Sequence, residues 1–406
     1  MYSLIAAIWR PWEVCVTYEA GAIQFEEFPK TKEPAWILGV GYNTVKDRQE
    51  LQNDISSRLW FTYRKNFTPI GGTGPMSDQG WGCMLRCGQM MLGQALICRH
   101  LGRDWRWKSA VYDNDYTKIL QLFLDKKDSC YSIHQIAQMG VSEGKSVGQW
   151  FGPNTVAQVL KKLALFEDWS SLAIHVAMDN TVIIDDIKKL CRSARQPTPS
   201  QVTNSFLCNG VSAEQTSARS RSPALPWQPL MLIIPLRLGL SELNPVYTDC
   251  LKACFTLRQS LGMIGGKPNH AHYFIGYVGN SLVYLDPHTT QPAVELEGNV
   301  PIPDSSFHCT HPSRMNIQDL DPSIALGFFC QDEADFADLC ENMRRLIIGQ
   351  KTQNAMFEVV QSRPAHWPPY VLPTRPDGTK TDFTSLDYEQ DIGDRQYDSD
   401  EEFEIL

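Results

Sequence analysis

The chain has 406 residues and a formal net charge of −9, so it is long enough to bury a full hydrophobic core. The charge is concentrated at one end: residues 377–406 hold eleven Asp and Glu against two Lys and Arg, and the other 376 residues hold 35 of each sign. A body without net charge gives no indication of nucleic-acid binding. Apolar residues make up 43% of the chain but never run for 18 positions, which argues against a membrane span.

The twelve cysteines include no Cys-x-x-Cys pair, which removes the main support for a zinc-ribbon or thioredoxin-like protein. This cysteine content in a long chain is typical of a reducing compartment, so we expect a cytoplasmic protein. His308, Cys309 and His311 form a loose group that we interpret as structural rather than metal-binding. No metal and no organic cofactor is expected.

Helical spacing dominates the first half of the chain. Residues 34–42 predict a strand and turn, residues 51–67 carry aromatic and charged side chains at helical spacing, and residues 70–75 predict a loop. From Cys83 an apolar pattern covers nearly every face, which predicts a buried central helix. Further helices are expected at Tyr116–Leu124, Ser132–Met139, Asn154–Leu165 (with Asn154 as N-cap) and Asp185–Cys191, and a strand at Ile174–Ala177.

The second half is rich in strands. Residues 193–227 are dominated by Ser, Thr, Pro and Gln, which predicts a flexible connection. Strands are expected at Leu230–Ile234, Ala271–Val278, Ser281–Leu285 and Leu326–Cys330, with a hairpin turn at Gly279-Asn280 and a helix at Asp335–Ile348. Beyond Gln361, prolines and acids predict disorder. The class is therefore α+β, and a cysteine helix followed by a sheet resembles papain-like cysteine proteases.

Cys83 is the candidate nucleophile, because Gly80-Trp81-Gly82 precedes it and a helix follows it. The N-terminus of a helix presents unsatisfied N–H groups and the positive end of the macrodipole, which favour thiolate over thiol. Cys87 lies one turn further on; as a residue type it fits either the core or a redox partner.

Two histidines compete as the base. Asp286-Pro287-His288 places a carboxylate and an imidazole two residues apart, so both project to the same side of an extended segment. His272 opens the hydrophobic strand ending Gly276-Tyr277, a position similar to that of the catalytic histidine of papain. The residues alone leave both open. For the oxyanion hole, the backbone N–H of Cys83 is one donor, and either Gln79 or Tyr63 supplies the second.

Several longer motifs carry a resemblance to a known family. They are residues 58–64, 71–75, 80–89, 152–155 and 284–291. All are similar to the autophagins, the cysteine proteases of autophagy that process GABARAP-type ubiquitin-like modifiers, and most closely to vertebrate A/B-type members. The resemblance runs from about Phe25 to Val360.

The resemblance implies a role for each matching residue. Cys83 would be the nucleophile, His288 the general base and acid, Asp286 the residue that orients the imidazole, and Tyr63 the hydroxyl of the oxyanion hole. Trp150 and the loop Gly262–Pro268 would form a gate over the active-site groove, and Cys87 would be a redox-regulatory position.

The resemblance also implies an organisation of the chain. It predicts a papain-like protease domain at 25–111 and 196–360, an inserted helical subdomain at 112–195, and a disordered acidic tail at 361–406 after a variable segment 1–24. In the tail, Phe403 and Leu406 are three apart and preceded by acids, a pattern that adds a strand to such modifiers.

The expected function is that of a monomeric cysteine endopeptidase. It would cut after the C-terminal glycine of GABARAP-type modifiers, both in precursors and in conjugates with phosphatidylethanolamine, and would meet membranes only through the lipidated substrate. Another thiol acyl-transfer enzyme, deubiquitinase-like or transglutaminase-like, would share the same residues. A non-catalytic modifier-binding protein relying on Phe403 is the third interpretation.

Overall fold

The fold is known from a computed structural model that describes residues 15–16, 28–109, 111–193, 226–295, 301–348 and 355–375. Most of the connection predicted at 193–227 (residues 194–225), the tail motif Phe403 and Leu406, and nearly all of segment 1–24 lie outside these residues. None of the helices within the described ranges is both long and apolar enough to cross a membrane.

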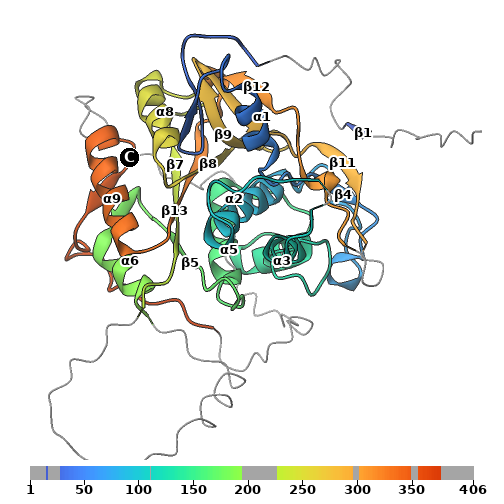
Figure 1. Cartoon of the computed structure of the whole chain (residues 1–406). Coiled ribbons are helices and arrows are strands. Elements are labelled where there is room, and N and C mark those ends of the chain that lie inside the picture. Colours follow the sequence, from blue (N-terminus) through green and yellow to red (C-terminus); the bar gives the residue numbers. More distant parts are fainter. Residues whose placement is uncertain are drawn as a thin grey trace, which may run out of the picture.

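A mixed sheet forms the centre of the described part of the molecule (Figure 1). Its strands, in spatial order, are β12 (Ser313–Asn316), β10 (Ser281–Leu285), β9 (His272–Val278), β8 (Ser260–Gly265), β13 (Ser323–Cys330), β7 (Leu230–Arg237) and β5 (Ala173–Val176), with β2 (Ala35–Ile37) joining β9 to β3 (Val40–Tyr42). All described neighbours are antiparallel except β5 and β7, which are parallel.

Helices cover both faces of this sheet (Figure 1). One face carries α2 (Cys83–His100), α3 (Asn114–Gln121), α4 (Ile133–Met139) and α5 (Pro153–Leu163), and the other carries α6 (Ile184–Cys191), α8 (Thr248–Thr256) and α9 (Glu333–Met343). Each face of the sheet has its own hydrophobic core, and successive residues of β7 belong to the two cores alternately. Met231 and Ile233 belong to one core, and Leu232 belongs to the other. Side chains alternate between faces in this way because the strand period is two.

A second, small sheet connects distant parts of the chain. The strand β4 (Tyr63–Lys65) runs parallel to β11 (Thr289–Pro292), and β1 (Cys15–Val16) pairs with the other edge of β11. Thr290 lies opposite Tyr63 in this register. The segment that follows His288 is therefore held beside the segment that contains Tyr63. A separate pair of strands, β6 (Thr181–Ile183) and β14 (Glu358–Val360), is also parallel.

The α+β class is confirmed, and so are the central helix at Cys83, the four helices predicted between 116 and 191, and the predicted strands. Three local predictions are wrong. The helical pattern at 51–67 yields α1 (Arg48–Ser56) and then the strand β4. The N-cap of α5 is Gly152, with Pro153 as the first helical residue, rather than Asn154. Of the loop predicted at Gly262–Pro268, the part up to Gly265 belongs to the buried strand β8.

The region 112–195, expected to be an inserted helical subdomain, also supplies a strand to the central sheet. Its strand β5 pairs with β7 at one edge, and side chains of α3, α4 and α5 share a core with α2. The packing of these helices therefore bears directly on the helix that carries Cys83.

Candidate active site

Cys83 is the first residue of α2, and the glycines before it allow the chain to turn sharply there. Gly80 has a φ of 86°, in the left-handed region that side chains other than glycine rarely adopt. A Cβ on Gly82 would lie 2.3 Å from Oδ2 of Asp78, and the Gly82 N–H donates to the Asp78 carbonyl at 2.8 Å. The N-cap is Gly82, with no side-chain cap, so first-turn N–H groups remain to stabilise a thiolate.

A buried ion pair holds this loop against the helix. The Arg86 guanidinium donates through Nε to Oδ2 of Asp78 at 2.7 Å and through Nη2 to Oδ1 of Asp78 at 3.1 Å. Arg86 also reaches Asp125 at 2.9 Å. Sequence reasoning gave Asp78 and Arg86 no role, although an arginine within an apolar helix needs a buried carboxylate partner. The position of Arg86 within an apolar helix could therefore have indicated a buried carboxylate nearby.

The imidazole and the carboxylate come from the turn between β10 and β11. Nδ1 of His288 lies 2.5 Å from Oδ1 of Asp286, which also accepts the His288 backbone N–H at 2.9 Å. The indole N–H of Trp60 donates to the Asp286 carbonyl at 2.7 Å. These contacts fix the plane of the imidazole and leave Nε2 for the thiol side.

The thiol of Cys83 and the imidazole of His288 shift each other's pKa. Burial alone would raise the pKa of Cys83, but hydrogen bonding to His288 and the imidazolium charge lower it below the usual 9.0. Burial likewise opposes protonation of His288, but hydrogen bonds to Asp286 and Cys83 raise its pKa to about 9. Each group thus favours the charged form of the other, and the pair favours thiolate and imidazolium together.

Tyr63 lies at the same site. Its backbone N–H donates to the Pro287 carbonyl at 2.9 Å, and its ring meets the His288 ring edge-on with centroids 5.5 Å apart. Its side chain contributes to the lowered pKa of the Cys83 thiol. The other candidate donor, Gln79, is exposed, so the geometry favours Tyr63.

His272, the rival base, also belongs to this neighbourhood. Its ring lies 5.4 Å from that of His288 and 4.4 Å from that of Tyr284, centroid to centroid. Burial lowers the pKa of His272 to about 4, so this ring is neutral at physiological pH. The hydrogen bonds to Asp286 and Cys83 both belong to His288, which therefore has the geometry of the base.

The gate and redox candidates differ in their burial. Trp150 is half-buried and packs on the core that includes Cys83, while Pro268 is exposed on the turn between β8 and β9. That turn leads directly to Ala271, whose backbone is hydrogen-bonded to the Cys83 side chain. Cys87 is fully buried, which raises the pKa of its thiol well above 9.0.

The loose group at 308–311 has an ordinary structural explanation. Nε2 of His308 bonds the Tyr116 hydroxyl at 2.7 Å, and Nδ1 bonds the Ser56 carbonyl at 2.8 Å. Both ring nitrogens are therefore occupied in binding α1 and α3 to the loop before β12.

A thiolate on a buried helix that faces an imidazole carried by a sheet is the arrangement of papain-like cysteine proteases, and the fold is of that class. The model of the Peptidase C54 catalytic domain matches residues 48–342. The chain belongs to the Peptidase C54 family and is a cysteine protease.

The relatives agree with this assignment. The chain is 56% identical to cysteine protease ATG4A of Gallus gallus over 382 residues, which are 94% of this chain and 99% of that protein. It is 55% identical to cysteine protease ATG4A of Homo sapiens over 383 residues, covering 94% and 95%. It is 56% identical to cysteine protease ATG4B of Gallus gallus over 399 residues, covering 96% and 98%. The predicted membership of the autophagins is confirmed.

Proposed function

We propose that this protein is an autophagy endopeptidase that cuts after the C-terminal glycine of GABARAP-type ubiquitin-like modifiers. The observation that carries the proposal is the pairing of Cys83 with an imidazole that Asp286 holds at 2.5 Å, in a member of the C54 family. A polarised thiolate suits attack on a carbonyl, and the proposed substrates offer a glycine carbonyl with no side chain.

The chemistry follows from the positions of the groups. The Cys83 thiolate attacks the glycine carbonyl carbon, and the resulting oxyanion accepts hydrogen bonds from the Cys83 N–H and the Tyr63 hydroxyl. The His288 imidazolium then gives its proton to the leaving amine as the carbon–nitrogen bond breaks. Water, deprotonated by the now neutral imidazole, hydrolyses the thioester and frees the modifier and the thiolate.

The same steps serve two substrates, because only the leaving amine differs. In a precursor that amine belongs to the next residue of the peptide, and in a lipid conjugate it belongs to phosphatidylethanolamine. We therefore propose both maturation and delipidation, by a cytoplasmic monomer that meets membranes through its lipidated substrate.

Three further regions are given roles in this proposal. Trp150 and the exposed turn carrying Pro268 form a gate that admits only glycine before the scissile bond, supported by the link from that turn through Ala271 to Cys83. Phe403 and Leu406 bind the modifier as an added strand. Cys87 remains the redox candidate, although its buried thiol disfavours direct oxidation in the folded enzyme.

A cleavage panel tests the proposal. Wild-type protein and Cys83→Ala are incubated with modifier precursors, a modifier–phosphatidylethanolamine conjugate and a linear ubiquitin fusion, with and without reductant. We expect wild type to cleave the modifiers and spare ubiquitin, and Cys83→Ala to bind precursor without cutting it.

The alternatives predict different products. Cleavage of the ubiquitin fusion in preference to the modifiers would favour a deubiquitinase-like enzyme. Binding without turnover by the wild type, and no labelling of Cys83 by a thiol-reactive substrate analogue, would favour the non-catalytic binding protein. Turnover retained by Cys83→Ala would overturn the assignment of the nucleophile.

A further inference from the structure

A third titratable side chain stands beside the catalytic pair without a part in the mechanism above. His272, Asp286 and His288 each offer one ligand atom, and these three atoms all lie within 4.8 Å of one another. His272 is nearly buried and opens β9, whereas Asp286 and His288 come from the turn after β10. Neighbouring strands thus bring a second imidazole to the carboxylate.

Two imidazoles and one carboxylate are a ligand set that zinc prefers. Three protein ligands with a fourth position left open are the usual donors of an accessible Zn²⁺ site, and nitrogen donors disfavour Mg²⁺ and Ca²⁺. At bond lengths of about 2.0–2.1 Å, ligand atoms in a tetrahedral site are roughly 3.3 Å apart. Nδ1 of His288 and Oδ1 of Asp286 are 2.5 Å apart, so that pair would need to open by less than about 1 Å.

An ion can also reach this site. The side chain of Asp286 is 33% exposed, whereas that of His288 is 3% exposed. The carboxylate therefore offers the first contact from solvent, and the two imidazoles lie behind it. The Trp60 indole, bonded to the Asp286 carbonyl, and the Tyr284 ring beside His272 restrict movement of two of the ligands.

We propose that His272, Asp286 and His288 bind a Zn²⁺ ion that reversibly inhibits the protease. The ion displaces the Nδ1 proton that His288 shares with Asp286 and releases it to solvent. With Nδ1 bound to the metal, His288 can no longer form the imidazolium that proton transfer requires. His272 is what distinguishes this site from simple capture of zinc by a thiolate and one imidazole. The inhibitory consequence rests on the proposed function, but the binding itself does not.

The first test measures binding directly. The full-length protein competes for Zn²⁺ with a chromogenic chelator, in parallel with three variants. We expect His272→Ala to weaken zinc binding by at least about tenfold, since even outer-shell partners of a metal ligand change affinity about 10- to 100-fold. Cys83→Ala should retain the affinity within about threefold. His270→Ala removes an exposed histidine two residues away and should bind as wild type does.

The reverse pattern would overturn the proposal. If Cys83→Ala loses the ion and His272→Ala keeps it, zinc is held by the thiolate and His288 alone. Equal binding by wild type and His272→Ala would also exclude His272 as a ligand. Circular dichroism checks that each variant is folded, and His272→Gln, which keeps a polar side chain of similar size, replaces His272→Ala if the latter unfolds.

The second test measures inhibition of precursor cleavage, each variant being compared with its own metal-free rate. The zinc concentration for half-inhibition should rise at least about tenfold in His272→Ala and stay unchanged in His270→Ala. An excess of chelator should restore the rate of the wild type. Failure of every substrate to be cleaved would count against the proposed function only, because the binding measurement would still decide the metal site.

Discussion

Two clusters of buried charged side chains lie near α2 and have different functions. The catalytic cluster (Cys83, Asp286, His288) is at the start of the helix. The Asp54 cluster (Asp54, Arg58, Arg103, Arg106) lies beside its C-terminal half, where Gln94 accepts a hydrogen bond from Arg58 at 2.8 Å. Both contain a carboxylate and positively charged partners. They differ in how many of their polar groups have hydrogen-bond and ion-pair partners.

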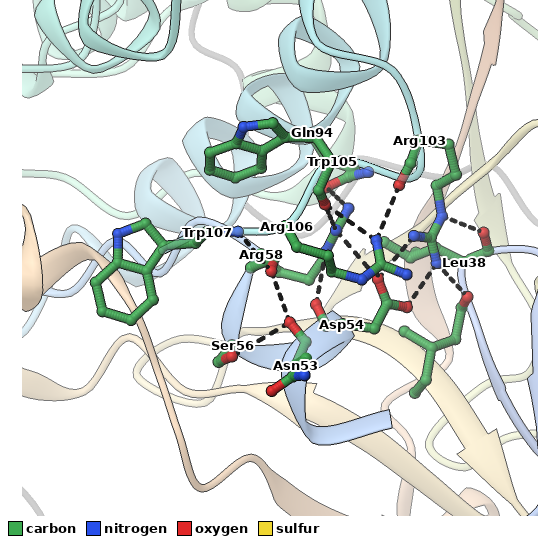
Figure 2. Close-up of polar contacts among 12 residues, drawn as sticks. Leu38, Asn53, Asp54, Ser56, Arg58, Gln94, Arg103, Trp105, Arg106 and Trp107 are labelled. Carbon is green, nitrogen blue, oxygen red and sulfur yellow. Dashed lines mark hydrogen bonds and ion pairs between the residues drawn. The ribbon is translucent and has the colours of Figure 1, made fainter. Parts of the chain in front are cut away.

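In the Asp54 cluster three guanidinium groups converge on one carboxylate (Figure 2). Arg103 binds both oxygens of Asp54 at 2.8 Å and also donates to the Ile37 and Leu38 carbonyls. Arg58, which is fully buried, donates to the Asp54 and Trp105 carbonyls. The cluster thereby connects α1, α2 and the turn between β2 and β3.

The catalytic cluster has fewer hydrogen-bond partners, and the protons in its hydrogen bonds can be transferred from one group to another. Nδ1 of His288 is held by Asp286, and the opposite side of the ring faces a thiolate that must leave this contact to react. A fully paired cluster positions elements of the fold, whereas a cluster with a transferable proton performs chemistry. Mutations in the catalytic cluster should therefore lower activity with little effect on stability. Mutations in the Asp54 cluster should lower stability with little effect on activity.

The largest effect is expected from His288→Ala. Removing the imidazole takes away both the proton donor and the charge that stabilises the thiolate, so kcat/KM for precursor cleavage should fall by about 10⁴-fold or more. The melting temperature should change little in comparison. His272→Ala is the matched variant, with a much smaller loss expected at metal-free conditions. A loss from His272→Ala as deep as that from His288→Ala would restore His272 as the base.

The next effect should be on stability. Asp54→Asn keeps the shape of the side chain but leaves the fully buried Arg58 without its carboxylate, which should lower the free energy of unfolding by about 3–5 kcal/mol. Glu50→Ala, an exposed change on the same helix, should shift it by less than about 0.5 kcal/mol. Denaturant titration gives both values, and activity per folded molecule should survive in both variants. A loss below about 1 kcal/mol for Asp54→Asn would contradict a structural role.

The two clusters also differ in how far the sequence predicts them. Cys83 could be found because local signals agree: two glycines, then an apolar helical pattern. Asp286 and His288 are two residues apart on one segment, so their proximity is also a local property. Choosing His288 over His272, and Tyr63 over Gln79, required the resemblance to a family, since spacing alone left them open. The Asp54 cluster joins residues up to 52 positions apart, from Asp54 to Arg106, and no local pattern indicates that pairing.

Two of the wrong predictions also concern contacts between residues that are distant in the sequence. The Ser260–Gly265 segment contains glycines and was expected to be a gate loop in part, yet all of β8 is buried. A Cβ on Gly262 would lie 2.2 Å from the Phe274 carbonyl oxygen, and one on Gly265 would lie 2.7 Å from Ile324. Those glycines permit close packing of neighbouring strands. Likewise, Tyr63–Lys65 becomes a strand because β11, more than 200 residues later, supplies its partner.

The smallest predicted effect, and the one that probes the catalytic cluster alone, is its response to alkaline pH. The pKa of His288 is raised to about 9 and that of Cys83 is lowered below 9.0, so a rise through pH 9 removes the imidazolium proton and leaves the thiolate. Cleavage needs that proton for the leaving amine, so kcat/KM should fall by about tenfold per pH unit above pH 9. Alkylation of Cys83 by iodoacetamide needs only the thiolate and should not fall.

The raised pKa of His288 also has a consequence for the fold, and its sign matters for this experiment. A group whose pKa is higher in the folded state stabilises the fold fully below its usual value of 6.5, and this stabilisation is lost as the pH rises through about 9. Circular dichroism at each pH must therefore show a folded protein before the two rates are compared. A parallel fall of cleavage and alkylation in folded protein would mean that the thiolate, rather than the imidazolium, limits the reaction, and the assignment of His288 as the proton donor would have to be abandoned.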